Sequence, residues 1–250
     1  MKLSITQIKS FKACRRAWEL RYKEGLRPIQ TAEALELGKS YHELLEGLEK
    51  GEGLDYDVYD KAHAMARAYE KYILPRFKVV AAEQELEKEL GGHTLHGFVD
   101  GLSDDGHIVE HKTTSMDIAE GGEYEYNLLW DEQVLAYMSL SGLRKVHYTV
   151  CKKPTIRLKK DETDEEFYNR MVAWYDDDTE NKIRVFTVER TDEEVSQWER
   201  DFVAIAGEME RGIIYKNTCH CVQYGRRCEY ASVCLHYDPE LQYIEFERSE

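Results

Sequence analysis

The 250-residue chain has no run of 18 or more apolar residues, so no membrane-spanning helix is predicted. It also lacks a Gly-rich phosphate-binding loop, which excludes a nucleotide-driven motor of the P-loop type. The opening sequence, MKLSITQIKSFKACRR, lacks the apolar segment of a signal peptide. We therefore expect a cytoplasmic protein. Hydrophobic residues make up 42% of the chain, enough for one large folded core.

An excess of positive charge is lacking too, since the net charge is −15. The charge is unevenly distributed, however. Residues 1–30 hold eight Lys and Arg against two Glu, and residues 144–160 hold seven Lys and Arg and no acidic residue. Two basic zones on an acidic chain can contact a phosphate backbone, and they can equally be ordinary solvated faces.

The order of helical and strand patterns predicts a mixed α/β fold, with helices around a small central sheet. The turn sequence SDDG at residues 103–106 predicts a hairpin between the second and third strands. Ser4 followed by Gln7 is typical of a helix N-cap. Helices are predicted at about 4–23, 31–50, 57–73, 125–141, 164–176 and 192–211, and strands at about 79–90, 93–102, 107–113, 145–151 and 182–189.

The hairpin carries two acids and a lysine. Alternate residues of a strand face the same side, so Glu110 and Lys112 project together, and Asp100 ends the neighbouring strand. Two carboxylates from adjacent strands can hold a hard divalent cation, which acidifies a bound water and neutralises charge on a phosphate. Lys112 would orient or deprotonate that water, or stabilise the pentavalent phosphorus. His111, between them, is a further candidate metal ligand.

Two helices add polar side chains to this set. His42 follows GKSY on a helix, and its imidazole would complete a mixed nitrogen and oxygen shell that accepts Mn²⁺ as well as Mg²⁺. Gln133 and Tyr137 are four residues apart, so they share one helix face. We expect both at the cleft, holding phosphate or orienting Lys112. The alternatives are a surface histidine, a solvated glutamine and a half-buried tyrosine.

Cysteines gather in the C-terminal tail. Tight spacing in a chain without a secretion signal favours metal binding over disulfides. Four thiolates hold zinc or an iron–sulfur cluster. The cysteines here are spaced more widely than the CxxC pairs typical of zinc ribbons, which favours the cluster. Cys219 and Cys221 compete for one ligand position, and Cys151 is expected to be an ordinary core cysteine. The candidate cluster ligands are Cys14, Cys221, Cys228 and Cys234.

Together these residues resemble the RecB/AddB-type branch of the PD-(D/E)XK nuclease superfamily, especially its small stand-alone phage and CRISPR-associated members. Six elements carry the resemblance in order: LSITQIKSFKACRRAWELRY, GKSYH, GFVDG, VEHKT, DEQVLAY and CVQYGRRCEYASVC. The first acidic element has a GxxD form rather than Pro-Asp. The resemblance implies that the metal ligands are His42, Asp100 and Glu110 and that the catalytic lysine is Lys112. It implies that Gln133 and Tyr137 are the QxxxY pair. A structural 4Fe–4S cluster would be held by Cys14, Cys221, Cys228 and Cys234.

The resemblance also implies a restriction-endonuclease-like core in a single domain, residues 1–250. Its catalytic core would span about 31–190, and residues 1–30 and 215–237 would form the iron–sulfur staple. The implied activity is that of a Mg²⁺- or Mn²⁺-dependent DNA exonuclease or end-processing nuclease. Its substrates would be single-stranded DNA or duplex ends, in recombination, repair or phage DNA metabolism, with a strand-annealing or recombination protein as partner.

Two alternative functions stay open at this point. The chain could be a non-catalytic iron–sulfur DNA-binding module, or a zinc-stapled subunit of a larger nuclease complex. Glu85, on the strand before the hairpin, is a candidate extra active-site carboxylate.

Overall fold

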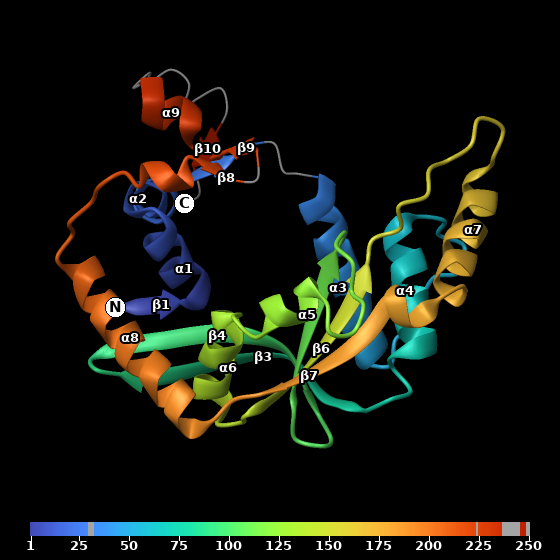
Figure 1. Cartoon of the computed structure of the whole chain (residues 1–250), viewed down its shortest axis with the longest axis horizontal. Helices are drawn as coiled ribbons and strands as arrows, with labels where there is room; N and C mark the ends of the chain where they lie inside the picture. The colour runs from blue at the N-terminus through green and yellow to red at the C-terminus, as the bar shows by residue number, and fades with distance from the viewer. Residues whose placement is uncertain (30–32, 224, 237–245, 249–250) are drawn as a thin grey trace. The chain divides into compact units, whose positions relative to one another are not determined.

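The computed structural model describes residues 1–29, 33–223, 225–236 and 246–248. A mixed sheet with strand order β1-β4-β5-β6-β7 organises the fold, and β3 also pairs with β4 (Figure 1). β4 and β5 are antiparallel, β5 and β6 parallel, and β6 and β7 antiparallel. The predicted mixed α/β fold is therefore confirmed. The strands are β1 (Lys2–Ser4), β3 (Val79–Leu90), β4 (His93–Ser103), β5 (Ile108–Thr114), β6 (Lys145–Lys152) and β7 (Ile183–Glu189).

Backbone contacts divide the chain into two compact units, and each is described by itself. The first comprises Met1–Ala32, Glu87–His96 and Gln197–Glu250, and the second comprises Glu33–Leu86 and Gly97–Ser196. The strands β3 and β4 contribute residues to both units.

Helices cover the sheet in the second unit. α3 (Glu33–Glu49) and α4 (Lys61–Tyr72) pack together, and their apolar residues share a core with Cys151 of β6 and Ile183 of β7. Cys151 is fully buried, in line with its predicted role as a core cysteine. α7 (Asp164–Asp176) packs on α4. The parallel strands β5 and β6 need a crossover, which α5 (Glu123–Leu128) and α6 (Glu132–Ser141) supply.

The first unit contains α1 (Ile5–Ala13), α2 (Arg15–Tyr22) and most of α8 (Asp192–Glu210). A small core joins Leu20 and Leu26 to Tyr230, Val233 and Phe246 from the C-terminal segment. The shorter elements are β2 (Leu26–Pro28), 3₁₀ helix η2 (Thr218–His220), β8 (Val222–Gln223), β9 (Arg226–Arg227), α9 (Ala231–His236) and β10 (Phe246–Arg248).

Three predicted helices differ from the structure. The helix predicted at 4–23 breaks at Cys14, whose backbone is extended with φ −160° and ψ 113°. The helix predicted at 125–141 is divided before Asp131, whose side chain caps α6. The helix predicted from residue 57 begins at Lys61, because Asp60 accepts a hydrogen bond from the His63 N–H and caps it there.

Other predicted boundaries agree closely. Ser4 accepts a hydrogen bond from the backbone N–H of Gln7 at 3.3 Å, as the N-cap prediction required. The helix predicted at 164–176 is α7, without change. Residue 31, the predicted start of the second helix, lies outside the described residues. In the described part of the chain, every helix is too short or too polar to span a bilayer.

Candidate active site

The β4–β5 hairpin brings Asp100 and Glu110 together. Gly101 pairs with Val109 and Leu102 with Ile108, so the register continued by one residue sets Asp100 opposite Glu110. Gly106 closes the turn with a φ of 79°, a conformation that favours glycine. The hairpin prediction is confirmed. The backbone N–H of His111 donates to Asp100 Oδ2 at 2.8 Å and fixes that carboxylate on β4.

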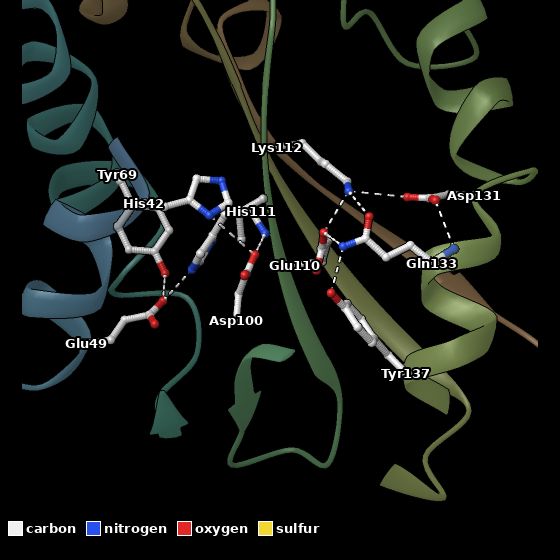
Figure 2. A network of polar contacts seen from close by, with 11 residues as sticks. His42, Glu49, Tyr69, Asp100, Glu110, His111, Lys112, Asp131, Gln133 and Tyr137 are labelled. Atoms are coloured by element: carbon white, nitrogen blue, oxygen red, sulfur yellow. Dashed lines mark hydrogen bonds and ion pairs between the residues drawn. The ribbon is translucent and has the colours of Figure 1, made fainter. Parts of the chain in front are cut away.

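Glu110 and Lys112 project from the same face of β5 toward α6 (Figure 2). The Lys112 ammonium lies 2.7 Å from Glu110 Oε1 and donates to Gln133 Oε1 at 3.3 Å. The Gln133 amide nitrogen donates to Glu110 Oε1 at 3.1 Å and to the Tyr137 hydroxyl at 2.7 Å. The four side chains expected to meet at the cleft therefore form one hydrogen-bonded group.

Burial and neighbouring charges together shift the pKa values of Glu110 and Lys112. Glu110 is 2% exposed, and this burial, with the charge of Asp100, raises its pKa to about 8 although Lys112 opposes the shift. Burial alone would lower the pKa of Lys112, but the charges of Glu110 and Asp131 outweigh it and raise that pKa. The raised pKa favours the ammonium form of Lys112, which donates hydrogen bonds. Glu110 Oε2 is buried and has no hydrogen-bond partner, which suits a cation ligand.

Asp131 belongs to this site and was not singled out from the sequence. Its Oδ2 lies 3.3 Å from the Lys112 ammonium, and its Oδ1 accepts the backbone N–H of Gln133 at 3.1 Å. The signal was present in the element DEQVLAY, because an aspartate directly before a helix is a preferred N-cap. Capping α6 places Asp131 where it also pairs with the lysine.

His42 lies on α3 with its Nδ1 3.8 Å from Asp100 Oδ2. Burial, reinforced by the nearby charges of His111 and Lys112, lowers its pKa in spite of Asp100. A neutral imidazole is the form that binds a metal ion. In the described part of the chain, one group of three potential metal ligands has its ligand atoms within 4.8 Å of one another. It consists of Asp105, His107 and His147. His42, Asp100 and Glu110 are spaced more widely than that trio.

His111 has both ring nitrogens engaged away from Glu110. Its Nδ1 lies 2.6 Å from the Thr149 hydroxyl, and its Nε2 lies 3.0 Å from Glu49 Oε1. The Tyr69 hydroxyl donates to the same Glu49 oxygen at 2.6 Å (Figure 2). Burial would lower the pKa of His111, but Glu49 outweighs it and raises that pKa. This arrangement leaves the backbone N–H of His111, rather than its ring, directed at Asp100.

Glu49 and Tyr69 were not identified from the sequence. Glu49 has a side chain only 1% exposed and follows His42 by seven residues, two helical turns on the same face of α3. That spacing was the available signal. By contrast, Glu85, the candidate extra carboxylate, is exposed on β3.

In the first unit, the predicted cluster cysteines line one pocket: Cys14, Cys221, Cys228 and Cys234. Asn217 links two of them, since its N–H donates to Cys14 Sγ at 3.4 Å and its carbonyl lies 3.8 Å from Cys221 Sγ. Burial is the main cause that raises the pKa of the Cys228 thiol. Cys219 is exposed and is not among the residues lining this pocket. Cys221 rather than Cys219 therefore lies in the pocket with the other three cysteines.

Both basic zones have part of their charge paired with acidic residues. In the first zone, Arg15 pairs with Glu208, Arg16 with Glu19 and Glu24, and Arg21 with Glu229. In the second zone, Arg144 pairs with Asp192, Lys145 with Glu189 and Lys152 with Asp117. These ion pairs reduce the charge available for a phosphate backbone. The second zone continues from β6 into a loop, and Lys152 is opposite Thr114, two residues beyond Lys112 along β5. That loop begins at the end of β6, the strand that pairs with the one carrying Glu110 and Lys112.

The model of the PD-(D/E)XK nuclease superfamily matches residues 2–235. This chain belongs to that superfamily. Its members use divalent metal ions, and the mixed sheet flanked by helices is consistent with their restriction-endonuclease-like core. The recognition of this superfamily from the sequence is therefore confirmed.

Solved structures are similar to the chain at low sequence identity. A putative exonuclease from Eubacterium rectale is 11% identical with a TM-score of 0.54, over 94% of this chain and 93% of that one. This likeness concerns the fold. A phage-related exonuclease from Haemophilus somnus 129PT is 14% identical with a TM-score of 0.43, over 83% and 92% of the two chains. An alkaline exonuclease from Laribacter hongkongensis is 12% identical with a TM-score of 0.39, over 84% and 89%. A search of curated proteins gave no match.

The raised pKa of Glu110 predicts a pH-dependent response to divalent cations. Because the folded pKa of about 8 exceeds the ordinary glutamate value of 4.5, the stability that this carboxyl contributes is present below pH 4.5 and is lost as pH rises through 8. A cation binds only the ionised form, so its affinity should increase about 10–100-fold between about pH 6 and pH 9.

Thermal unfolding with a Mg²⁺ titration at each pH measures this effect. The rise in Tm at a fixed Mg²⁺ concentration should grow with pH in the wild-type chain and lose this growth in Glu110→Gln. A rise in Tm that is equal at both pH values would contradict the assignment.

Proposed function

We propose that this chain is a DNA nuclease that hydrolyses phosphodiester bonds at DNA ends, using Mg²⁺ or Mn²⁺ held by His42, Asp100 and Glu110. The observation that carries the proposal is the buried Glu110 carboxylate, with one unpartnered oxygen beside the charge of Asp100. A divalent cation would neutralise both carboxylates and draw the three side chains together. Membership of a metal-dependent nuclease superfamily supports the same chemistry.

The bound cation would act as a Lewis acid on the phosphate and lower the pKa of the attacking water. Lys112 would donate a hydrogen bond to a phosphate oxygen and stabilise the charge that develops there. Glu110, Asp131 and Gln133 hold the Lys112 ammonium at 2.7–3.3 Å, so its position is set before the substrate arrives. Tyr137 supports Gln133 through its hydroxyl.

Exposed aromatic side chains near the site suit unpaired bases. Trp130 is 73% exposed, Tyr126 is 59% exposed, and their ring centroids lie 6.3 Å apart. Trp130 directly precedes Asp131, which pairs with Lys112. Stacking on such rings is tolerant of sequence, as an end-processing enzyme requires. The basic loop after β6 would contact the phosphate backbone, with binding that weakens as salt rises.

We also propose that Cys14, Cys221, Cys228 and Cys234 hold a 4Fe–4S cluster. Their shared pocket and the N–H···S contact from Asn217 support this, because iron–sulfur clusters are held by four thiolates and tuned by such hydrogen bonds. Residues 1–30 and 215–237 would then be stapled within a single nuclease domain. Residues 30 and 237, at the ends of these ranges, lie outside the described part of the chain.

The biological setting that fits is DNA end resection in recombination, repair or phage DNA metabolism. A strand-annealing or recombination protein would take over the strand that resection exposes. The solved structure of similar fold from Eubacterium rectale is described as a putative exonuclease, which favours end-directed cleavage over internal cleavage.

Lys112→Ala and Asp100→Ala should each lower cleavage of linear DNA about 100-fold or more, because Lys112 would stabilise charge on the reacting phosphate and Asp100 would hold the metal ion. Lys71→Ala is the matched control, since Lys71 is exposed on α4 and pairs with Asp176. Digestion of end-labelled linear and circular DNA with Mg²⁺ gives the measurement. Undiminished cleavage in both site variants would refute the proposal, and wild-type binding without cleavage would favour the non-catalytic module.

Cys221→Ser should lose the visible absorbance of an iron–sulfur cluster and lower the Tm, while Cys219→Ser should keep both. The reason is that Cys221 lines the shared pocket and Cys219 does not. Iron analysis and absorbance spectra of anaerobically purified proteins test this. If the wild-type protein is colourless and contains zinc, the cysteines form a zinc site instead of an iron–sulfur site. Equal spectra in the two variants would overturn the choice of Cys221 as ligand.

A further inference from the structure

His111 is the residue that connects the three candidate metal ligands (Figure 2). It directly follows Glu110 in β5, so the peptide between them fixes where the Glu110 side chain starts. Its backbone N–H donates to Asp100 Oδ2 at 2.8 Å. Its ring meets the His42 ring edge-on, with centroids 5.8 Å apart and an interplanar angle of 85°. One residue therefore contacts all three side chains to which the cation is assigned.

The His111 ring is held by side chains from three other elements. Its Nε2 lies 3.0 Å from Glu49 Oε1 of α3, and its Nδ1 lies 2.6 Å from the Thr149 hydroxyl of β6. Tyr69 of α4 donates to the same Glu49 oxygen, and its ring lies edge-on to the imidazole with centroids 5.4 Å apart. Because each ring nitrogen has a polar neighbour and one ring edge is packed, the imidazole has little freedom to turn.

Burial indicates that Glu49 does more than fill the core. The side chains of Glu49 and His111 are 1% and 3% exposed. The neighbouring core residues of α3 and α4 are apolar and include Leu45, Leu48 and Met65. Burying a carboxylate among them costs free energy, and an apolar residue of similar volume would pack there without that cost. A carboxylate at this position is therefore explained better by its contact with His111 than by packing.

The direction of the ring argues for positioning rather than ligation. Alternate residues of a strand face opposite sides, so the His111 side chain faces away from Glu110 and Lys112. Its nitrogens are directed at Glu49 and Thr149. His111 thus acts on the site through its backbone N–H and its ring face. Groups that orient metal ligands in this way typically contribute 10–100-fold in metal affinity.

We propose that His111 is a positioning residue that holds the three candidate metal ligands for one divalent cation, and that Glu49 anchors it. This inference rests on the proposed function only in assigning the cation to those three ligands. Without its anchor, the ring would turn and the adjoining backbone would shift. The N–H donated to Asp100 and the starting point of Glu110 would shift with it, so the cation would bind more weakly.

The test is Mn²⁺ binding to the full chain, followed by EPR, which requires no cleavage. Glu49→Ala should weaken Mn²⁺ binding about 10–100-fold. Glu49→Gln should recover part of this loss, because its amide keeps an oxygen at the same position. Thr149→Val is nearly isosteric, removes only the hydroxyl beside Nδ1 and should also weaken binding.

Glu46→Ala is the matched control, because Glu46 lies on the same helix and pairs with the exposed Lys50. It should bind Mn²⁺ as the wild-type chain does. The Tm of each variant separates positioning from stability. If Glu49→Ala lowers the Tm but keeps wild-type Mn²⁺ affinity well below that Tm, the pair has only a structural role and the proposal is wrong.

Pulsed EPR at saturating Mn²⁺ separates positioning from ligation. Nitrogen coupling to the ion should disappear in His42→Gln and persist in His111→Gln. The reverse pattern would make His111 a ligand and overturn the proposal. Failure of the proposed function is distinguishable: a wild-type chain that shows all these Mn²⁺ effects but leaves DNA intact would refute the nuclease assignment and support the positioning role.

Discussion

The carboxylate of Glu110 is buried beside the charge of Asp100, and the rest of the site depends on how that charge is balanced. Isolated buried charges are costly, so the fold must supply an ammonium, a cation or a proton. Lys112 neutralises one oxygen of Glu110, and the other oxygen has no protein partner. The site is thus arranged around a carboxyl group that holds its proton more tightly than usual, and that a bound cation would favour in its ionised form.

The fold delivers these groups from different layers of the second unit. The hairpin sets Asp100 opposite Glu110, α6 brings Gln133, Tyr137 and its cap Asp131, and α3 brings His42. On the other face of β5, the buried Glu49–His111 pair sits behind the strand. Because the His111 N–H donates to Asp100, packing on that face sets the position of a candidate metal-binding carboxylate. Residues on both faces of β5 therefore position the side chains of the candidate active site.

Much of this could be read from the sequence, and the misses have identifiable causes. Alternation along β4 and β5 and the SDDG turn gave the hairpin, because those signals are local. Asp131 was missed because its pairing with Lys112 depends on where α6 begins, which a break at residues 129–131 determines. Glu49 and Tyr69 were missed because their contact with His111 arises from packing between α3, α4 and the sheet. The break at Cys14 was hidden by the helical periodicity on both of its sides.

The central claim is that one divalent ion is shared by His42, Asp100 and Glu110. Crystals grown with Mn²⁺ and measured for anomalous scattering would locate that ion directly. The account predicts a peak about 2.0–2.6 Å from carboxylate oxygens of Asp100 and Glu110, with a His42 nitrogen as a further ligand. A structure in which Glu110 stays paired only with Lys112 and Gln133, while manganese binds elsewhere, would contradict it.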